Sequence, residues 1–97
     1  MAFSIVLAPE AVADLKALKA GIRSAVRTSL ELHLRHEPTK TSRSSIKRLR
    51  GLARPQYRLR VGEVRVFYDV SGSTVEILAI VAKSEAATWL SEFGSRA

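Results

Sequence analysis

The chain contains no cysteine, which excludes disulfide bonds and thiolate chemistry. It also lacks a run of about 18 apolar residues, the length that a membrane-spanning helix requires. The first residues carry neither the basic start nor the long apolar stretch of a secretion signal. We therefore expect a cytoplasmic protein that does not bind membranes.

Motifs for common catalytic chemistry are also missing. There is no glycine-rich phosphate-binding loop, and no serine, histidine and aspartate are spaced like a hydrolytic triad. His33 and His36 lie three residues apart in a helical stretch, but no cysteine or carboxylate pattern near them completes a metal site. The sequence predicts neither a cofactor nor a metal.

The whole chain has a net charge of +7, and acidic residues are scarce in one part of it. Residues 40–65 contain nine basic residues and only one acidic residue, Glu63, whereas charges elsewhere nearly balance. A basic segment within a folded domain suggests a polyanionic partner, either nucleic acid or an acidic protein. A solvated face that keeps the protein soluble explains the same charge equally well.

The length and the apolar content are those of one soluble domain, covering residues 1–97. Hydrophobic residues make up 46% of the chain, and the mean hydropathy is +0.03. A chain of 97 residues supports one modest core, so a bound partner would add to its stability.

Two helices are predicted in the N-terminal half. The first begins at Pro9, which suits the first helical position, and Gly21 separates it from a second helix over residues 22–36. Three residues at helical spacing form the apolar stripe of the first helix: Val12, Leu15 and Leu18. On the second helix, Ile22, Val26, Leu30 and His33 share a face.

The remaining chain is mostly strand-like, followed by a short final helix with Ser84 as its N-cap. Strands are predicted over residues 3–7, 46–49, 56–61, 63–70 and 74–82, with a loop over residues 51–55. The order is β-α-α-β-β-β-β-α. It predicts an α+β domain in which a helical hairpin and a short C-terminal helix pack on one face of a small, mainly antiparallel sheet.

The stretch from Tyr57 to Tyr68 predicts a hairpin around Gly62-Glu63, since glycine at the first position favours a two-residue type II′ turn. The turn pairs Val61 with Val64 and, at the far end, Tyr57 with Tyr68. One face then carries six apolar side chains, those of Tyr57, Leu59, Val61, Val64, Val66 and Tyr68. The other face carries Arg58, Arg60, Arg65 and Phe67.

The arginines of this hairpin are unusual because Arg60 and Arg65 are directly opposed. Such a like-charge pair is unfavourable by roughly 0.2–1 kcal/mol. Three arginines and an aromatic ring on an open face can bind phosphates and stack a base. A charged face that only resists aggregation is the alternative. We favour binding.

Three segments resemble the signature of RelE/ParE-type toxins from bacterial type II toxin–antitoxin systems: Leu49-Arg50-Gly51-Leu52, Tyr57-Arg-Leu-Arg-Val-Gly62 and Val64-Arg-Val-Phe-Tyr68. The predicted helical hairpin and the last strand, followed by Lys83, fit the same plan. The resemblance implies a RelE-like fold and neutralisation by a cognate antitoxin. RelE-like toxins cut mRNA in the ribosomal A site, whereas ParE-like toxins inhibit DNA gyrase.

The resemblance to RelE implies a ribosome-dependent mRNA endonuclease (an mRNA interferase) that inhibits translation. The implied catalytic residues are Arg58, Arg60, Arg65 and Lys83. The implied RNA-binding residues are Lys47, Arg48, Arg50, Arg54, Phe67 and Trp89. The C-terminal segment departs from RelE, because Ser84 stands where an arginine is expected and Leu90 near the position of a tyrosine. A ParE-like gyrase inhibitor without nuclease activity therefore stays open, as does a degenerate toxin that binds only antitoxin and operator DNA.

The expected partners follow from these alternatives. They are an antitoxin with an acidic, amphipathic C-terminal segment, and either the ribosome with its mRNA or DNA gyrase. Operator DNA is expected to be bound only through the antitoxin. The lopsided charge of residues 40–65 is the reason to expect an acidic antitoxin segment.

Overall fold

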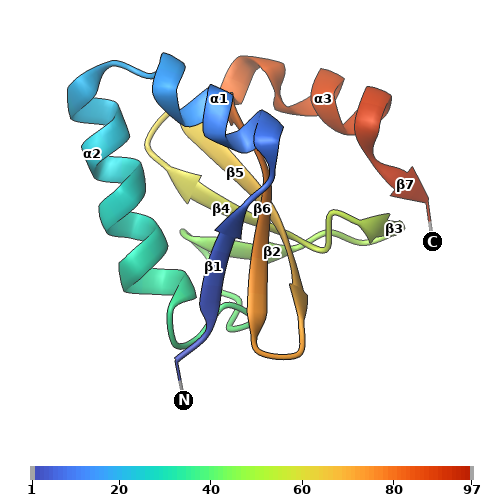
Figure 1. The fold of residues 1–97 in the computed structure, drawn as a ribbon. Coiled ribbons are helices and arrows are strands. Elements are labelled where there is room, and N and C mark those ends of the chain that lie inside the picture. The colour runs from blue at the N-terminus through green and yellow to red at the C-terminus, as the bar shows by residue number, and fades with distance from the viewer. Residues whose placement is uncertain (1, 97) are drawn as a thin grey trace.

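The computed structural model describes residues 2–96 as a five-stranded sheet with helices on both of its faces (Figure 1). The helical elements are α1 (Pro9–Ala17), α2 (Ala20–Ser29), the π-helical turn η1 (Leu30–Leu34), the 3₁₀ turn η2 (Lys83–Glu85) and α3 (Ala86–Phe93). The strands are β1 (Ser4–Leu7), β2 (Ile46–Arg48), β3 (Leu52–Arg54), β4 (Tyr57–Val61), β5 (Val64–Ser71), β6 (Thr74–Ala82) and β7 (Ser95–Arg96). This α+β architecture confirms the predicted fold class.

The main sheet has the order β1-β6-β5-β4-β2, in which only β1 and β6 run parallel. The predicted hairpin register is confirmed, with Val61 opposite Val64 and Tyr57 opposite Tyr68. Gly62 has a φ of 56°, a left-handed conformation that glycine adopts without a steric penalty, as the turn requires. The turn between β5 and β6 contains a second such residue, Gly72, with a φ of 58°.

The helical hairpin differs from its prediction at the break between the helices. Pro9 does begin α1, but the break falls at Leu18-Lys19, and Gly21 lies inside α2. The Arg23 side chain explains this position, because it donates hydrogen bonds to three carbonyl oxygens at the end of α1, those of Leu15, Lys16 and Leu18. A cation at these carbonyls stabilises the C-terminus of the helix.

The buried stripes of the two helices agree with the predicted ones in part. Leu15, Val26 and Leu30 are buried as predicted, whereas Val12 and Ile22 are exposed, and Ala11 and Leu34 complete the buried positions. These side chains pack on Leu59, Val66 and Tyr68 of the sheet. The predicted apolar face of the hairpin therefore does lie under the first two helices.

The third helix lies on the opposite face of the sheet, so the prediction of helices on one face was wrong. Phe67 points away from the core that holds its neighbours Val66 and Tyr68, and its ring stacks on Trp89 of α3. Two local predictions were wrong as well. The expected loop over residues 51–55 contains β3, which pairs with β7, and α3 begins after Glu85 without a side-chain cap from Ser84.

Candidate functional site

Four basic side chains lie together on the face of the sheet opposite to the core. Lys47 is paired with Arg58 across β2 and β4, and Arg60 is paired with Arg65 across β4 and β5. We call these four residues the basic face. Within residues 2–96, none of them forms an ion pair with a carboxylate.

Arg58 lies at the centre of the basic face and is partly buried. Its Nε atom is buried and finds no hydrogen-bond partner among the described residues. Desolvation by burial, followed by repulsion from Arg65 and Arg60, lowers the pKa of the Arg58 guanidinium. A buried donor among like charges costs free energy, and a bound anion would offset that cost.

The two opposed arginines have different environments. Arg65 is only 7% exposed, and its Nη1 atom donates to the carbonyl oxygens of Gly62 at 2.8 Å and Val64 at 3.0 Å. Arg60 is exposed. Arg65 therefore holds the hairpin turn as well as contributing charge, whereas Arg60 is free to contact a ligand.

Lys83 lies beside the same turn. Its backbone amide donates to the Glu63 carbonyl oxygen at 2.7 Å, and its side chain is exposed. The fold thus brings Arg60, Arg65 and Lys83 to the end of the sheet at the Gly62-Glu63 turn, and Arg58 follows on the same face of β4, opposite Phe67.

The aromatic pair was predicted to stack a base, and the structure shows a different arrangement. Phe67 is fully buried, and its ring stacks on Trp89 with a centroid separation of 5.0 Å and an interplanar angle of 5°. Trp89 also contacts the ring of Phe93 at 5.7 Å. In this conformation Trp89 occupies the ring face of Phe67 that a base would need, so Phe67 does not offer a stacking surface.

Three other predicted RNA-binding residues lie apart from the basic face. Arg48 is on the core side of the sheet, where its guanidinium lies 5.2 Å from the centroid of the Tyr57 ring. Arg50 is exposed in the turn between β2 and β3. Arg54 forms ion pairs with Asp69 at 3.6 Å and Glu76 at 3.1 Å. Of the predicted RNA-binding residues, only Lys47 belongs to the basic face.

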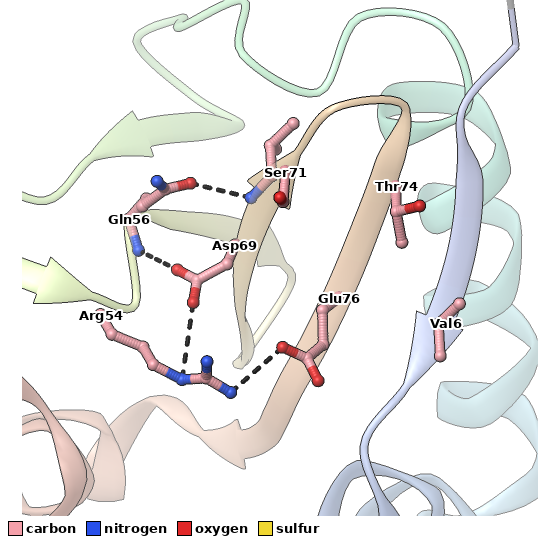
Figure 2. Close-up of a pocket in the computed structure, with 8 residues that line it drawn as sticks. Val6, Arg54, Gln56, Asp69, Ser71, Thr74 and Glu76 are labelled. Atoms are coloured by element: carbon pink, nitrogen blue, oxygen red, sulfur yellow. Dashed lines mark hydrogen bonds and ion pairs between the residues drawn. The ribbon is translucent and has the colours of Figure 1, made fainter.

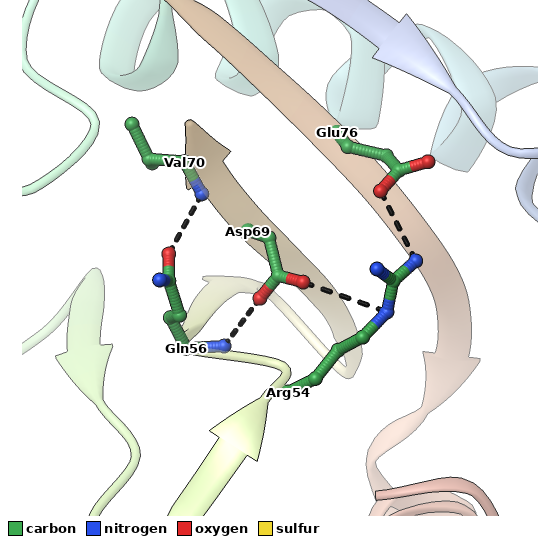
Figure 3. Close-up of polar contacts among 5 residues, drawn as sticks. All are labelled: Arg54, Gln56, Asp69, Val70 and Glu76. Atoms are coloured by element: carbon green, nitrogen blue, oxygen red, sulfur yellow. Dashed lines mark hydrogen bonds and ion pairs between the residues drawn. The ribbon is translucent and has the colours of Figure 1, made fainter. Parts of the chain in front are cut away.

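Sequence reasoning missed the groove around Arg54, which has a volume of about 490 Å³ (Figure 2). Asp69 accepts one hydrogen bond from the Gln56 backbone amide, and the Gln56 side-chain oxygen accepts one from the Val70 backbone amide (Figure 3). Asp69 and Glu76 are directly opposed across β5 and β6. The register of the turn at Ser71-Gly72-Ser73 would have identified this like-charge pair, which Arg54 neutralises in part.

The basic face can bind an anion, but it has few groups that can move a proton. Both tyrosines lie on the other face, stacked with a centroid distance of 5.4 Å, and the Tyr68 hydroxyl donates to the Pro38 carbonyl at 2.6 Å. Burial raises the pKa of Tyr68 well above its ordinary value. An arginine stays protonated, so it stabilises negative charge and is a poor general base.

Residues 5–87 match the family described as the ParE toxin of type II toxin–antitoxin systems. No curated protein matches the chain. Among solved structures, free Escherichia coli toxin RelE, with two arginines replaced by alanine, shares 21% identity (TM-score 0.71; coverage 95% of this chain and 94% of RelE). The toxin–antitoxin complex RelBE2 from Mycobacterium tuberculosis shares 25% identity (TM-score 0.65; coverage 84% of this chain and 99% of the matched chain). The RelB–RelE complex from Methanococcus jannaschii shares 23% identity (TM-score 0.68; coverage 87% of this chain and 96% of the matched chain).

Proposed function

The chain belongs to the RelE/ParE family of type II toxin–antitoxin toxins, and from this premise we propose that it is a ribosome-dependent mRNA endonuclease. The observation that carries the proposal is the environment of Arg58. Its buried Nε atom has no partner within the described chain, and its neighbours Arg60 and Arg65 add charge that no carboxylate neutralises. A phosphate group supplies the missing acceptor and the missing counter-charge.

The proposed reaction is attack of a ribose 2′-oxygen on the adjacent phosphorus, with loss of the 5′-oxygen of the next nucleotide. Negative charge develops on the phosphorane, and arginines placed before the reaction stabilise it. Arg58 and Arg60 contact the phosphate, Arg65 contributes charge while holding the turn, and Lys83 lies beside them. No tyrosine lies on this face among residues 2–96, so we expect slow cleavage, in which groups of the ribosome remove the 2′-hydroxyl proton and protonate the leaving 5′-oxygen.

A second candidate is a gyrase inhibitor without nuclease activity. The match to the ParE family over residues 5–87 favours it, as does the lack of a proton-transferring tyrosine on the basic face. In that case the same arginines bind an acidic surface of gyrase or its DNA, and no bond is broken.

A cognate antitoxin is the proposed regulatory partner. The solved structures from M. tuberculosis and M. jannaschii are toxin–antitoxin complexes. An acidic, amphipathic antitoxin segment would lie across the basic face and neutralise Arg58 and Arg60. Association would then slow with added salt, because charge attraction accelerates the encounter. Operator DNA would be bound through the antitoxin.

Primer extension on mRNA from cells expressing the chain, run beside a gyrase supercoiling assay, tests these functions. We expect ribosome-dependent cuts that Arg58→Gln reduces roughly 100-fold, because the phosphate loses a preorganised donor. Arg27→Gln, at an exposed arginine of α2, is the matched control and should cut normally. Inhibited supercoiling without cuts supports the second candidate. If neither activity appears but the chain still binds antitoxin, it is a degenerate toxin.

A further inference from the structure

The two edges of the main sheet are protected differently. The edge strand β2 carries two basic side chains, Lys47 and Arg48, whereas β1 is the uncharged run Ser4–Leu7. Natural edge strands usually carry charges, proline or a covering segment, which prevent pairing with another chain. Among the described residues next to β1, a side chain bonds the backbone only at Phe3, the residue before the strand, whose carbonyl accepts a hydrogen bond from Arg35 at 2.9 Å.

The backbone of β1 presents bonding groups along its outer edge. The amides of Ser4 and Ala8 donate to Ser73 and Ile77, both at 2.8 Å, so the even-numbered residues face β6. The amides and carbonyls of Ile5 and Leu7 therefore point away from β6. In the part of the chain that the structure describes, β1 pairs with no second strand.

The groove around Arg54 adjoins this edge. Val6 is 50% exposed and lines the groove, and the register places Val6, Glu76 and Asp69 in one row across β1, β6 and β5 (Figure 2). One cation, Arg54, faces two carboxylates there (Figure 3). The groove thus carries net negative charge in a chain whose net charge is +7.

We propose that the outer edge of β1 binds an extended segment of a partner protein, and that a basic side chain of this segment enters the groove. A strand added beside β1 places one residue next to Val6, about 10 Å from the Glu76 backbone, because strands lie about 4.8 Å apart. A long basic side chain lying over Val6 reaches the Glu76 carboxylate, one oxygen of which is bonded to Arg54. Backbone bonds to Ile5 and Leu7 supply affinity, and the groove supplies specificity.

NMR titration of the ¹⁵N-labelled full chain tests this proposal without the natural partner. The probes are acetyl-Thr-Val-Arg-Val-Thr-amide and the same peptide with glutamine at its centre. We expect the largest amide shifts at Ile5 and Leu7, and roughly fivefold tighter binding of the arginine peptide. Glu76→Gln should remove that preference, whereas Glu92→Gln, at an exposed acid of α3, should keep it.

Each arm can contradict the proposal. An arginine peptide with N-methyl groups at the bonding positions should lose its binding, and if it binds normally the strand-addition geometry is wrong. Shifts centred on Arg58 and Arg60, or equal affinity for the two peptides, would also overturn the proposal. The titration uses neither RNA nor gyrase, so its outcome is independent of the proposed activity.

Discussion

The two faces of the central sheet are built for different purposes. On the face under α1 and α2, Leu59, Val66 and Tyr68 are fully buried among other apolar side chains. On the opposite face, charges are separated along the strands, with cations at one end and the acid-lined groove at the other, and α3 covers the centre. The first face can hold the fold together while the second keeps charges that are unfavourable for stability but suited to binding.

Leu59→Ala should cause the largest loss of stability, because Leu59 is fully buried on the face under the helices. We expect the free energy of unfolding to fall by about 2–5 kcal/mol, a large share of the stability of a small domain. Urea denaturation measures the change. Val6→Ala, on the opposite face and half exposed, is the control, and an equal loss there would contradict the contrast between the faces.

Trp89→Ala should have a smaller effect, since it removes the stack of Trp89 on Phe67 between α3 and the second face. We expect a loss of about 1–3 kcal/mol, together with faster amide exchange in α3. Hydrogen exchange measured by NMR gives both the global free energy of unfolding and the exchange rates of the α3 amides. Phe93→Ala keeps that stack and truncates a ring that is 62% exposed, so it should cost less. Unchanged exchange in α3 would show that other contacts hold the helix.

Tyr68→Phe should cost about 1 kcal/mol at neutral pH, because the hydrogen bond to Pro38 is lost. Burial raises the pKa of Tyr68 in the folded chain, whereas an unfolded tyrosine ionises near pH 10. The unfolded state therefore loses this proton first, and stability falls as pH rises above about 10. The variant should lack that part of the fall. Thermal melting between pH 8 and 11 measures it, and parallel curves for the two proteins would contradict the assignment.

Arg60→Ala and Arg65→Ala should separate charge from structure on the basic face. Arg65→Ala removes two hydrogen bonds to the turn and should lower the free energy of unfolding by about 1 kcal/mol. Arg60→Ala relieves a like-charge pair and should leave stability unchanged or raise it by a few tenths of a kcal/mol. Both should abolish growth inhibition. Thermal melting compared with a growth assay tests this, and a large destabilisation by Arg60→Ala would refute it.

Local rules were sufficient for the hairpin. Gly62-Glu63 sets the turn, the turn sets the register, and the period of two then assigns Leu59 to the core and Arg58 to the opposite face. The same rules failed at the ends of helices. The helix break falls at Leu18-Lys19, where the side chain of Arg23 bonds carbonyls five to eight residues before it at the end of α1, and a glycine signal carries no information about that contact.

The sequence by itself determined which residues carry charge and which strand faces they occupy, because strand alternation is a property of the backbone. Tertiary structure alone decided which charged and aromatic side chains remain available to a ligand. Phe67 was predicted to meet a base and is covered by Trp89, and Arg54 was predicted to bind RNA and is paired with Asp69 and Glu76. These partners are distant in sequence, and only the folded chain brings their side chains within contact distance.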